Sequence, residues 1–282
     1  MDRTVKELLF EAKNELRSIT DTPSLDASIL FEKACGLNKV KQITFSDKLI
    51  NEAEQKEFFQ LIKRRLNHEP IAYIISKKEF YGRDFIVSSD TLIPRADTET
   101  LVEATINYIN TLDYKPDVLD LCTGTGCVGL SVALETNLSS ISLCDISDEA
   151  LKIAQKNAKA LYSKEINFIK SDLLENCKNY DIIVSNPPYL TNQWCEELDE
   201  DVKKEPILAL EGFGQDGLDI IRKIITSAKS HFNSNKNAIF LECDSRQCNT
   251  VKYILEANSF KEIEIFKDLA NRDRVVKGIY ER

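Results

Sequence analysis

The part of the chain from Asp117 onward alternates short apolar runs with amphipathic stretches, and this pattern constrains the fold more than any other feature. Runs such as "DVLDLC", "SISLCDI" and "YDIIVSN" are typical of buried strands, and stretches such as "DEALKIAQKNAKAL" carry apolar residues at helical spacing. Alternation of this kind predicts an α/β domain, a mostly parallel sheet with helices on both faces. The runs "KEIEIFKD" and "RVVKGIYE" have only a short connector, so they predict an antiparallel pair at the end of the chain.

The residues before this region show no such alternation. Three amphipathic stretches predict a helical domain over residues 1–75, and the third, "NEAEQKEFFQLIKRRLNHEP", stops before Pro70. Residues 76–95 are rich in aromatic and β-branched side chains around Gly82, which predicts a β-hairpin linking the two domains. Residues 96–282 then form the predicted Rossmann-like domain.

Composition narrows the class of protein. The chain of 282 residues is long enough to bury a sizeable core. Its net charge of −9 argues against a protein that binds mainly to the phosphate backbone of a nucleic acid. No apolar run reaches the roughly 18 residues of a membrane span, and the first residues do not resemble a signal peptide. Eight cysteines without a C-x-x-C pair, beside only two histidines, predict reduced thiols in a cytoplasmic protein and no metal site.

A glycine-rich segment, "DLCTGTGCVG", lies between the first strand of the alternating region and its helix. Gly124, Gly126 and Gly129 fit G-x-G-x-x-G, and Asp145 ends the next strand, where an acid can accept both ribose hydroxyls. The pattern serves a dinucleotide or S-adenosylmethionine. Asp120 would repel a pyrophosphate but suits a cationic amino-acid moiety, which favours S-adenosylmethionine.

Asp172 ends the third strand of this region. Its carboxylate could accept from an adenine amino group, and the alternative is that it caps a helix formed by "LLENC".

The segment "DIIVSNPPYL" runs from a strand directly into Asn186, Pro187, Pro188 and Tyr189. In an open α/β sheet, ligands lie outside the carboxyl ends of the strands, so this motif is expected in the same crevice as the glycine loop. The prolines stiffen the loop and remove two donors, leaving the Asn186 side-chain oxygen and the Pro187 carbonyl as acceptors for an NH₂ group. Methylation of a planar amide or aromatic amine needs such acceptors, because its lone pair is delocalised.

Several segments together resemble the peptide chain release factor glutamine methyltransferases, the PrmC/HemK family: "EFYGRDF", "LIPRADTETLVE", "DLCTGTG", "NPPYL", "EPILALEGFGQDGL" and "RDRVVKG". The resemblance implies a class I S-adenosylmethionine-dependent methyltransferase fold. It implies methyl transfer to the side-chain amide nitrogen of the glutamine in the Gly-Gly-Gln motif of class I release factors, which tunes translation termination and yields S-adenosylhomocysteine. It further implies a helical N-terminal domain that helps to hold the release factor. We expect a monomer without a direct nucleic-acid or membrane partner.

The resemblance also implies the site residues. Asn186, Pro187, Pro188 and Tyr189 are expected to bind the glutamine and to be catalytic. The cofactor is expected against Cys122, Thr123, Gly124, Thr125, Gly126, Asp145, Asp172, Leu173 and Asn186.

Four further positions are marked by the resemblance. Phe80 and Arg95 are expected in the wall of the cofactor pocket, with core packing and a structural ion pair as their respective alternatives. Cys122 and Ser76 stand where the family usually has glycine.

Three other functions stay open at this point. A nucleic-acid amine methyltransferase would share the Asn-Pro-Pro-Tyr chemistry, although no basic stripe is visible. An NAD-dependent oxidoreductase would rest on the glycine pattern alone and leave Asn-Pro-Pro-Tyr unexplained. A binding protein without catalysis is disfavoured, since every polar group that the motifs need is present.

Overall fold

The computed structural model describes residues 3–233 and 236–281, which fall into two compact units. The first unit comprises the chain up to Lys77 together with Asp199–Lys204, and the second comprises Lys78–Leu198 and the chain from Glu205 onward. The hairpin expected as a separate linker therefore lies mostly in the second unit. The return of residues 199–204 to the first unit is a feature that the sequence did not indicate.

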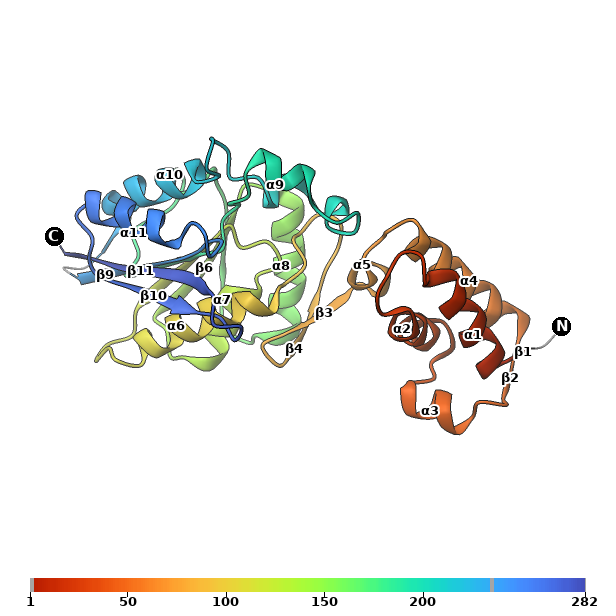
Figure 1. The fold of residues 1–282 in the computed structure, drawn as a ribbon. Helices are drawn as coiled ribbons and strands as arrows, with labels where there is room; N and C mark the ends of the chain where they lie inside the picture. Colours follow the sequence, from red (N-terminus) through yellow and green to blue (C-terminus); the bar gives the residue numbers. More distant parts are fainter. Residues whose placement is uncertain (1–2, 234–235, 282) are drawn as a thin grey trace. The chain divides into compact units, whose positions relative to one another are not determined.

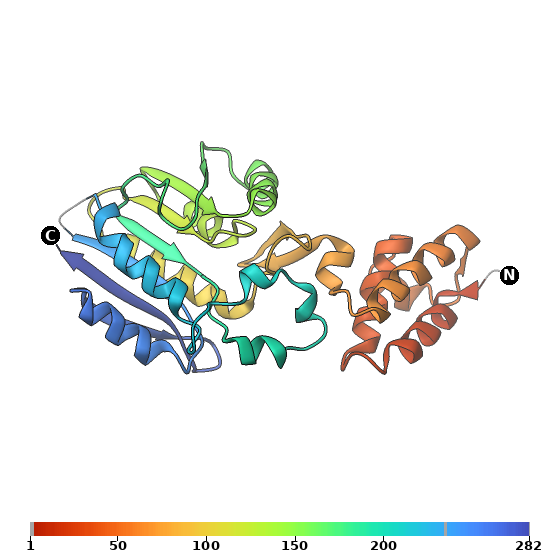
Figure 2. The same cartoon turned by 90° about the horizontal axis from the view of Figure 1, so that it is seen from above.

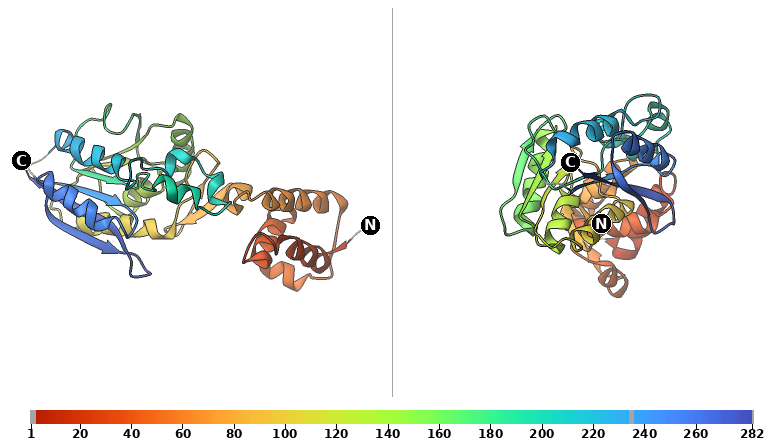
Figure 3. Two further views of the ribbon diagram at one scale, coloured as in Figure 1. Left: turned by 45° about the horizontal axis from the view of Figure 1, so that its top comes forward. Right: turned by 90° about the vertical axis from the view of Figure 1, so that its left-hand side faces the viewer.

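The first unit is helical, as predicted, and Figure 3 shows its helices side by side. A capping box between Thr4 and Glu7 starts the first helix, and the rings of Phe31 and Phe58 meet edge to face in the core, 5.1 Å apart. Two short strands, β1 and β2, pair antiparallel beside the helices. The elements are β1 (Arg3–Thr4), α1 (Val5–Leu16), α2 (Pro23–Cys35), α3 (Lys39–Thr44), β2 (Leu49–Ile50), α4 (Glu52–Leu66) and α5 (Ile71–Ile75).

A buried ion network in the first unit fixes the segment 199–204. The Arg65 guanidinium donates to the Asp26 carboxylate at 2.9 Å. It also forms a bidentate ion pair with Asp201, in which Nη1 lies 2.9 Å from Oδ1 and Nη2 lies 2.7 Å from Oδ2. The side chains of Arg65 and Asp26 are only 4 and 8 % exposed. Because neither charge has water around it, each depends on its partner.

The second unit is built on a seven-stranded sheet in the order β10-β11-β9-β8-β5-β6-β7. The five strands β5 to β9 run parallel, while β11 is antiparallel to both β9 and β10, which confirms the predicted antiparallel pair. The strands are β5 (Asp117–Leu121), β6 (Ser140–Asp145), β7 (Asn167–Lys170), β8 (Ile182–Ser185), β9 (Lys236–Glu242), β10 (Lys261–Lys267) and β11 (Asp273–Glu281).

Helices cover both faces of this sheet (Figure 1; Figure 2). Helices α6 (Glu99–Ile109), α7 (Cys127–Glu135) and α8 (Asp148–Leu161) bury one apolar core, and α10 (Asp219–Ala228) and α11 (Cys248–Ala257) bury the other. Among the described residues, no helix is long and apolar enough to cross a membrane.

The remaining elements are short. Strands β3 (Lys77–Phe80) and β4 (Arg83–Ile86) pair through a two-residue turn in which Tyr81 and Gly82 both have positive φ, as a tight hairpin turn requires. The others are α9 (Asn192–Glu196) and the 3₁₀ turns Ala96–Thr98, Val202–Lys204, Ile207–Ala209 and Lys229–His231.

The strand order places the site. The chain leaves β5 toward β6 and β7 on one side, and β8 and β9 lie on the other, so the order reverses at β5. A crevice opens outside the carboxyl ends of the strands at such a switch point. The loops after β5, β6 and β8 therefore meet there.

Candidate active site

A cavity of about 170 Å³ lies at this edge of the sheet, within the second unit. It gathers most of the residues that the sequence pointed to, from loops that are far apart along the chain. Those that line it are Cys122, Thr123, Gly124, Thr125, Asp145, Asp172, Leu173, Asn186 and Pro188. Gly126, Pro187 and Tyr189 are not among the lining residues.

The glycine loop folds back on itself through left-handed backbone. Cys122, Gly124 and Gly126 have φ of +59°, +52° and +81°, and the Gly126 N–H donates to the Thr123 carbonyl at 2.8 Å. Gly129 serves a different purpose. A Cβ on it would lie 2.4 Å from the Leu143 side chain, so only glycine lets α7 approach the strands this closely.

Asp120 ties the two ends of this loop together. One carboxylate oxygen accepts both the Thr123 hydroxyl at 2.6 Å and the Gly129 N–H at 2.8 Å. Burial raises the pKa of Asp120 to about 7, although these two hydrogen bonds oppose the rise. Asp120 also lines the cavity, where the sequence suggested a neighbour for a cationic group.

Asp145 stands at the end of β6 with its carboxylate fixed by backbone. One oxygen accepts the Gly124 N–H at 2.9 Å and the other accepts the Ser147 N–H at 3.0 Å. Burial raises the pKa of Asp145, while these bonds lower it. The carboxylate keeps free lone pairs for further donors, which suits a ribose diol.

Asp172 and Leu173 follow β7 and line the same cavity. The segment after Asp172 folds as a turn rather than as a helix, and Leu173 has a φ of +48°. The alternative in which Asp172 caps a helix is therefore wrong.

The Asn-Pro-Pro-Tyr loop leaves β8 and brings Asn186 and Pro188 to the cavity. The Asn186 Nδ2 donates to the Thr98 hydroxyl oxygen at 3.2 Å, so the side-chain oxygen is left to accept from a ligand. Tyr189 turns toward β9, where its hydroxyl is 3.5 Å from Glu242. Burial and the Glu242 charge raise the pKa of Tyr189, which keeps the phenol neutral.

Two glycines of "EGFGQDGL" pack against the backbone of this loop. A Cβ on Gly212 would lie 2.7 Å from the Tyr189 Cα, and a Cβ on Gly217 would lie 2.3 Å from the Tyr189 carbonyl oxygen. The Gln247 side chain donates to that same oxygen at 2.8 Å. Sequence reasoning quoted this glycine segment but missed its supporting role, and it missed Gln247 altogether.

Phe80 and Arg95 have different places. Phe80 is buried in the core, edge to face with Phe85, and is not among the cavity-lining residues. Arg95 lines the cavity and also forms an ion pair with the buried carboxylate of Glu205. That carboxylate accepts the Ile93 N–H as well, so it holds the segment before α6 against the loop after α9.

A sheet of this order, with a glycine loop after β5, an acid after β6 and Asn-Pro-Pro-Tyr after β8, defines a class I methyltransferase of the S-adenosylmethionine-dependent type. Family models agree: residues 7–75 match the PrmC N-terminal domain, and residues 98–205 match the methyltransferase small domain. The chain belongs to the release factor glutamine methyltransferase family.

Two relatives that match nearly the whole chain support this family assignment. The release factor glutamine methyltransferase of Clostridium acetobutylicum is 38 % identical, over 98 % of each chain. The one of Borreliella burgdorferi is 38 % identical over 90 % of this chain and 88 % of its own. A crystal structure of a methyltransferase from Pyrococcus furiosus is 16 % identical, covers 78 % of this chain and 98 % of its own, and superimposes with a TM-score of 0.52, which supports the fold alone. The oxidoreductase and binding-protein alternatives are set aside by this membership.

Proposed function

We propose that this protein transfers a methyl group from S-adenosylmethionine to the side-chain amide nitrogen of the Gly-Gly-Gln glutamine in class I release factors. The reaction would tune translation termination in the cytoplasm. The observation that carries the proposal is that Asn186 lines the same cavity as the glycine loop. Its side chain donates through Nδ2, so the side-chain oxygen is available to accept a hydrogen bond from a ligand. The names of the relatives over nearly the whole chain support the substrate.

The cavity fits the cofactor. Asp145 is held by two backbone N–H groups and retains lone pairs for the ribose hydroxyls, and Leu173 offers an apolar wall near the acceptor Asp172. The loop from Cys122 to Thr125 would hold the amino-acid end, with Asp120 beneath it. When bound, S-adenosylmethionine supplies an electrophilic methyl group on a sulfonium.

The Asn-Pro-Pro-Tyr loop would act on the amide nitrogen. The Asn186 oxygen and the Pro187 carbonyl accept the two amide hydrogens, which turns the nitrogen lone pair toward the methyl group. The same acceptors would stabilise the positive charge that develops on nitrogen as its conjugation with the carbonyl is lost. One of the two amide hydrogens would then leave as a proton to solvent, which gives the neutral N-methyl amide, and the cofactor would leave as the thioether S-adenosylhomocysteine. The backbone of Gly212 and Gly217 packs closely against this loop, and the Gln247 side chain donates to its Tyr189 carbonyl. Because these contacts fix the loop, the acceptors need little reorganisation.

Two further points belong to the proposal. The protein is expected to act as a monomer, and its acidic net charge of −9 supports recognition of a protein rather than of a phosphate backbone. The helical first unit would help to hold the release factor, in line with its match to the PrmC N-terminal domain.

The test is mass spectrometry of the Gly-Gly-Gln tryptic peptide from an unmethylated release factor, after incubation with this protein and S-adenosylmethionine. We expect a gain of one methyl group on the glutamine, lost in Asn186→Ala and kept in Asn192→Ala, an exposed asparagine further along the chain. A protein that binds S-adenosylmethionine but leaves an intact release factor unmodified would contradict the proposal. Methyl incorporation into RNA or DNA, with capture that weakens steeply with salt, would then favour the nucleic-acid alternative.

A further inference from the structure

Two pairs of cysteines bring their sulfurs close together in the second unit, and all eight cysteines of the chain are free thiols. The Sγ atoms of Cys144 and Cys177 are 3.7 Å apart, and those of Cys243 and Cys248 are 3.3 Å apart. A disulfide bond joins two sulfurs at about 2.05 Å. Each pair is therefore within a short movement of bonding, and the two pairs differ in their access to solvent.

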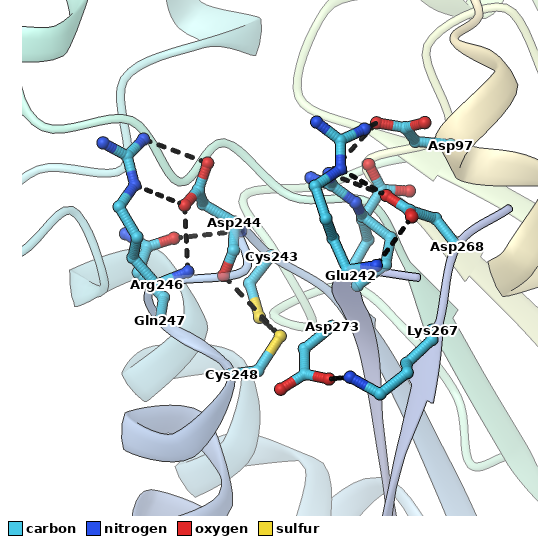
Figure 4. Close-up of polar contacts among 12 residues, drawn as sticks. Asp97, Glu242, Cys243, Asp244, Arg246, Gln247, Cys248, Lys267, Asp268 and Asp273 are labelled. Atoms are coloured by element: carbon cyan, nitrogen blue, oxygen red, sulfur yellow. Dashed lines mark hydrogen bonds and ion pairs between the residues drawn. The ribbon is translucent and has the colours of Figure 1, made fainter. Parts of the chain in front are cut away.

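The pair formed by Cys243 and Cys248 is closed to solvent. Cys243 follows β9, Cys248 begins α11, and both side chains are fully buried. Figure 4 shows the two sulfurs facing each other, with the Asp244 carbonyl oxygen 3.6 Å from the Cys248 sulfur. An oxidant dissolved in water reaches such sulfurs only when the structure opens locally. We therefore expect this pair to stay reduced in the folded protein.

The pair formed by Cys144 and Cys177 has one member that solvent can reach. Cys144 is fully buried on β6, whereas Cys177 is half-buried in the segment that follows β7. Hydrogen bonding between the two thiols lowers the pKa of Cys177, and burial opposes this effect. The thiolate is the form that reacts with oxidants. The more accessible sulfur is thus also the more reactive one, and a second thiol stands behind it to form the bond.

This pair is next to residues that line the candidate active site. Asp145, which lines the cavity, follows Cys144 directly in the chain. Leu173 also lines the cavity, and its carbonyl oxygen lies 3.5 Å from the Cys144 sulfur and 3.8 Å from the Cys177 sulfur. The two sulfurs must approach each other by roughly 1.7 Å to form a disulfide bond. Because β6 is hydrogen-bonded between β5 and β7, the turn from Asp172 to Cys177 is the part that has to move.

We propose that Cys144 and Cys177 are an oxidation site, and that the disulfide formed there displaces the Leu173 turn and weakens binding of S-adenosylmethionine. The oxidant is a peroxide, such as hydrogen peroxide. The Cys177 sulfur attacks one peroxide oxygen, the O–O bond breaks, and Cys177 becomes a sulfenic acid as one water leaves. The Cys144 sulfur then attacks the Cys177 sulfur, so that the S–S bond forms, the S–O bond breaks, and the Cys144 proton leaves with the second water. Two thiols are oxidised and one peroxide is reduced to two waters.

The first test is peptide mapping of the wild-type protein after a short exposure to hydrogen peroxide, with the remaining free thiols alkylated in denaturant before digestion. We expect one pair of peptides to be linked through Cys144 and Cys177, and the link to disappear after treatment with a dithiol reductant. Cys243 and Cys248 should be recovered as alkylated thiols, although their sulfurs are closer together. Absence of the first link, or equally fast oxidation of the buried pair, would overturn the inference.

The second test is calorimetry of S-adenosylmethionine binding to the reduced and the oxidised protein. We expect oxidation to raise the Kd on the order of 10-fold, and reduction to restore it. Cys177→Ser cannot form the bond, so its affinity should match that of the reduced wild type before and after peroxide. Cys195→Ser removes a half-buried thiol on α9 and should respond to peroxide as the wild type does. An unchanged Kd in protein that carries the disulfide would overturn the inference.

The last measurement uses the converse of this coupling. If the disulfide lowers the affinity for S-adenosylmethionine 10-fold, a saturating concentration of the cofactor must shift the dithiol–disulfide equilibrium about 10-fold toward the dithiol. In glutathione redox buffers, the midpoint potential of the pair should then be higher with the cofactor by about 30 mV. Equal potentials with and without the cofactor would overturn the inference. None of these readouts involves methyl transfer, so the inference goes beyond the proposed function and does not depend on which nitrogen receives the methyl group.

Discussion

At the scale of single residues, the backbone shows what two departures from the family pattern mean. Cys122 and Ser76 stand where the resemblance leads one to expect glycine, and both have a φ of +59°. A side chain in the left-handed region costs roughly 1–2 kcal/mol, so each position carries a small penalty that glycine would not. The thiol lines the cavity at the carboxyl ends of the strands, whereas Ser76 is an exposed cap at the end of α5.

We expect Ser76→Gly to raise the free energy of unfolding by about 0.5–1 kcal/mol, because glycine relieves the left-handed backbone at a helix end. The serine loses little, since its hydroxyl makes only a long 3.4 Å contact with the Tyr73 carbonyl. Urea unfolding measures the change. Ser76→Ala keeps the Cβ and should show no gain, and equal stability of the glycine and alanine variants would refute the strain argument.

Asp120 gives a second prediction at this scale. Its pKa rises from an ordinary 3.8 to about 7 in the folded protein, so between these values the folded protein holds a proton that the unfolded chain has released. Its contribution to stability is therefore complete at acid pH and is lost as pH rises through about 7. Asp120→Asn can still accept both bonds through one oxygen but does not titrate. Urea unfolding at pH 5 and pH 8 should show a smaller loss in the variant, and parallel behaviour of the two proteins would contradict this.

At the scale of elements, glycines set how closely segments approach each other. In Gly129→Ala the added Cβ would lie 2.4 Å from Leu143 and 2.8 Å from the Asp120 Cβ, so α7 must move off the sheet. We expect a loss of about 1–3 kcal/mol in the free energy of unfolding, and weaker binding of S-adenosylmethionine, because the helix start carries the loop. Gly36→Ala is the control: its Cβ meets nothing within 4 Å, and only its φ of +67° carries a penalty. Unchanged cofactor binding in Gly129→Ala would show that the loop does not depend on this packing.

Gly212→Ala tests the segment behind the Asn-Pro-Pro-Tyr loop. Its Cβ would lie 1.9 Å from the Gly217 carbonyl oxygen and 2.7 Å from the Tyr189 Cα, so the loop must shift. We expect kcat to fall on the order of 10-fold or more while calorimetry finds S-adenosylmethionine bound nearly as tightly, because the displaced groups act on the substrate amide. A loss of cofactor affinity with unchanged kcat would place the segment at the other end of the cavity.

At the scale of the whole molecule, Arg65 joins parts of the first unit that come from distant places in the chain. Arg65→Ala removes the partner of Asp26, whose side chain is only 8 % exposed. Breaking a buried pair in this way typically costs about 3–5 kcal/mol. Hydrogen exchange should therefore quicken across α2 and α4 and in residues 199–204. Arg64→Ala, on the same helix with a more exposed ion pair to Glu69, should change exchange much less. Equal effects of the two variants would mean that burial of the pair is not what matters.

The sheet, its antiparallel end and the helical first unit could be predicted from the sequence, and so could part of the cavity lining. Hydrophobic periodicity, glycine spacing and the polar residues at strand ends are all local patterns, which is why they can be read from the sequence. The contacts behind the Asn-Pro-Pro-Tyr loop could not be found this way. Glu242 reads as the end of an apolar strand, and the Tyr189 hydroxyl, 3.5 Å from its carboxylate, is far from it in the chain. Thr98, whose hydroxyl accepts from Asn186, is also far from that loop in the chain. The pairing of Arg65 with Asp201 has the same origin, since contacts between distant charged residues leave no periodic signal.

The segment Asp199–Lys204 falls within the residues that match the methyltransferase small domain, yet its contacts belong to the helical unit. The chain thus passes between the two units three times, after Lys77, after Leu198 and after Lys204. A recombination event that exchanged the first unit at Lys77 alone would bring a foreign partner to Asp201. Positions 26, 65 and 201 would have to be inherited together for a chimera to keep its buried charges paired. Lys77 looks like a natural boundary for exchanging one unit. Recombination at Lys77 alone should nevertheless be selected against, because it would leave buried charges without their partners.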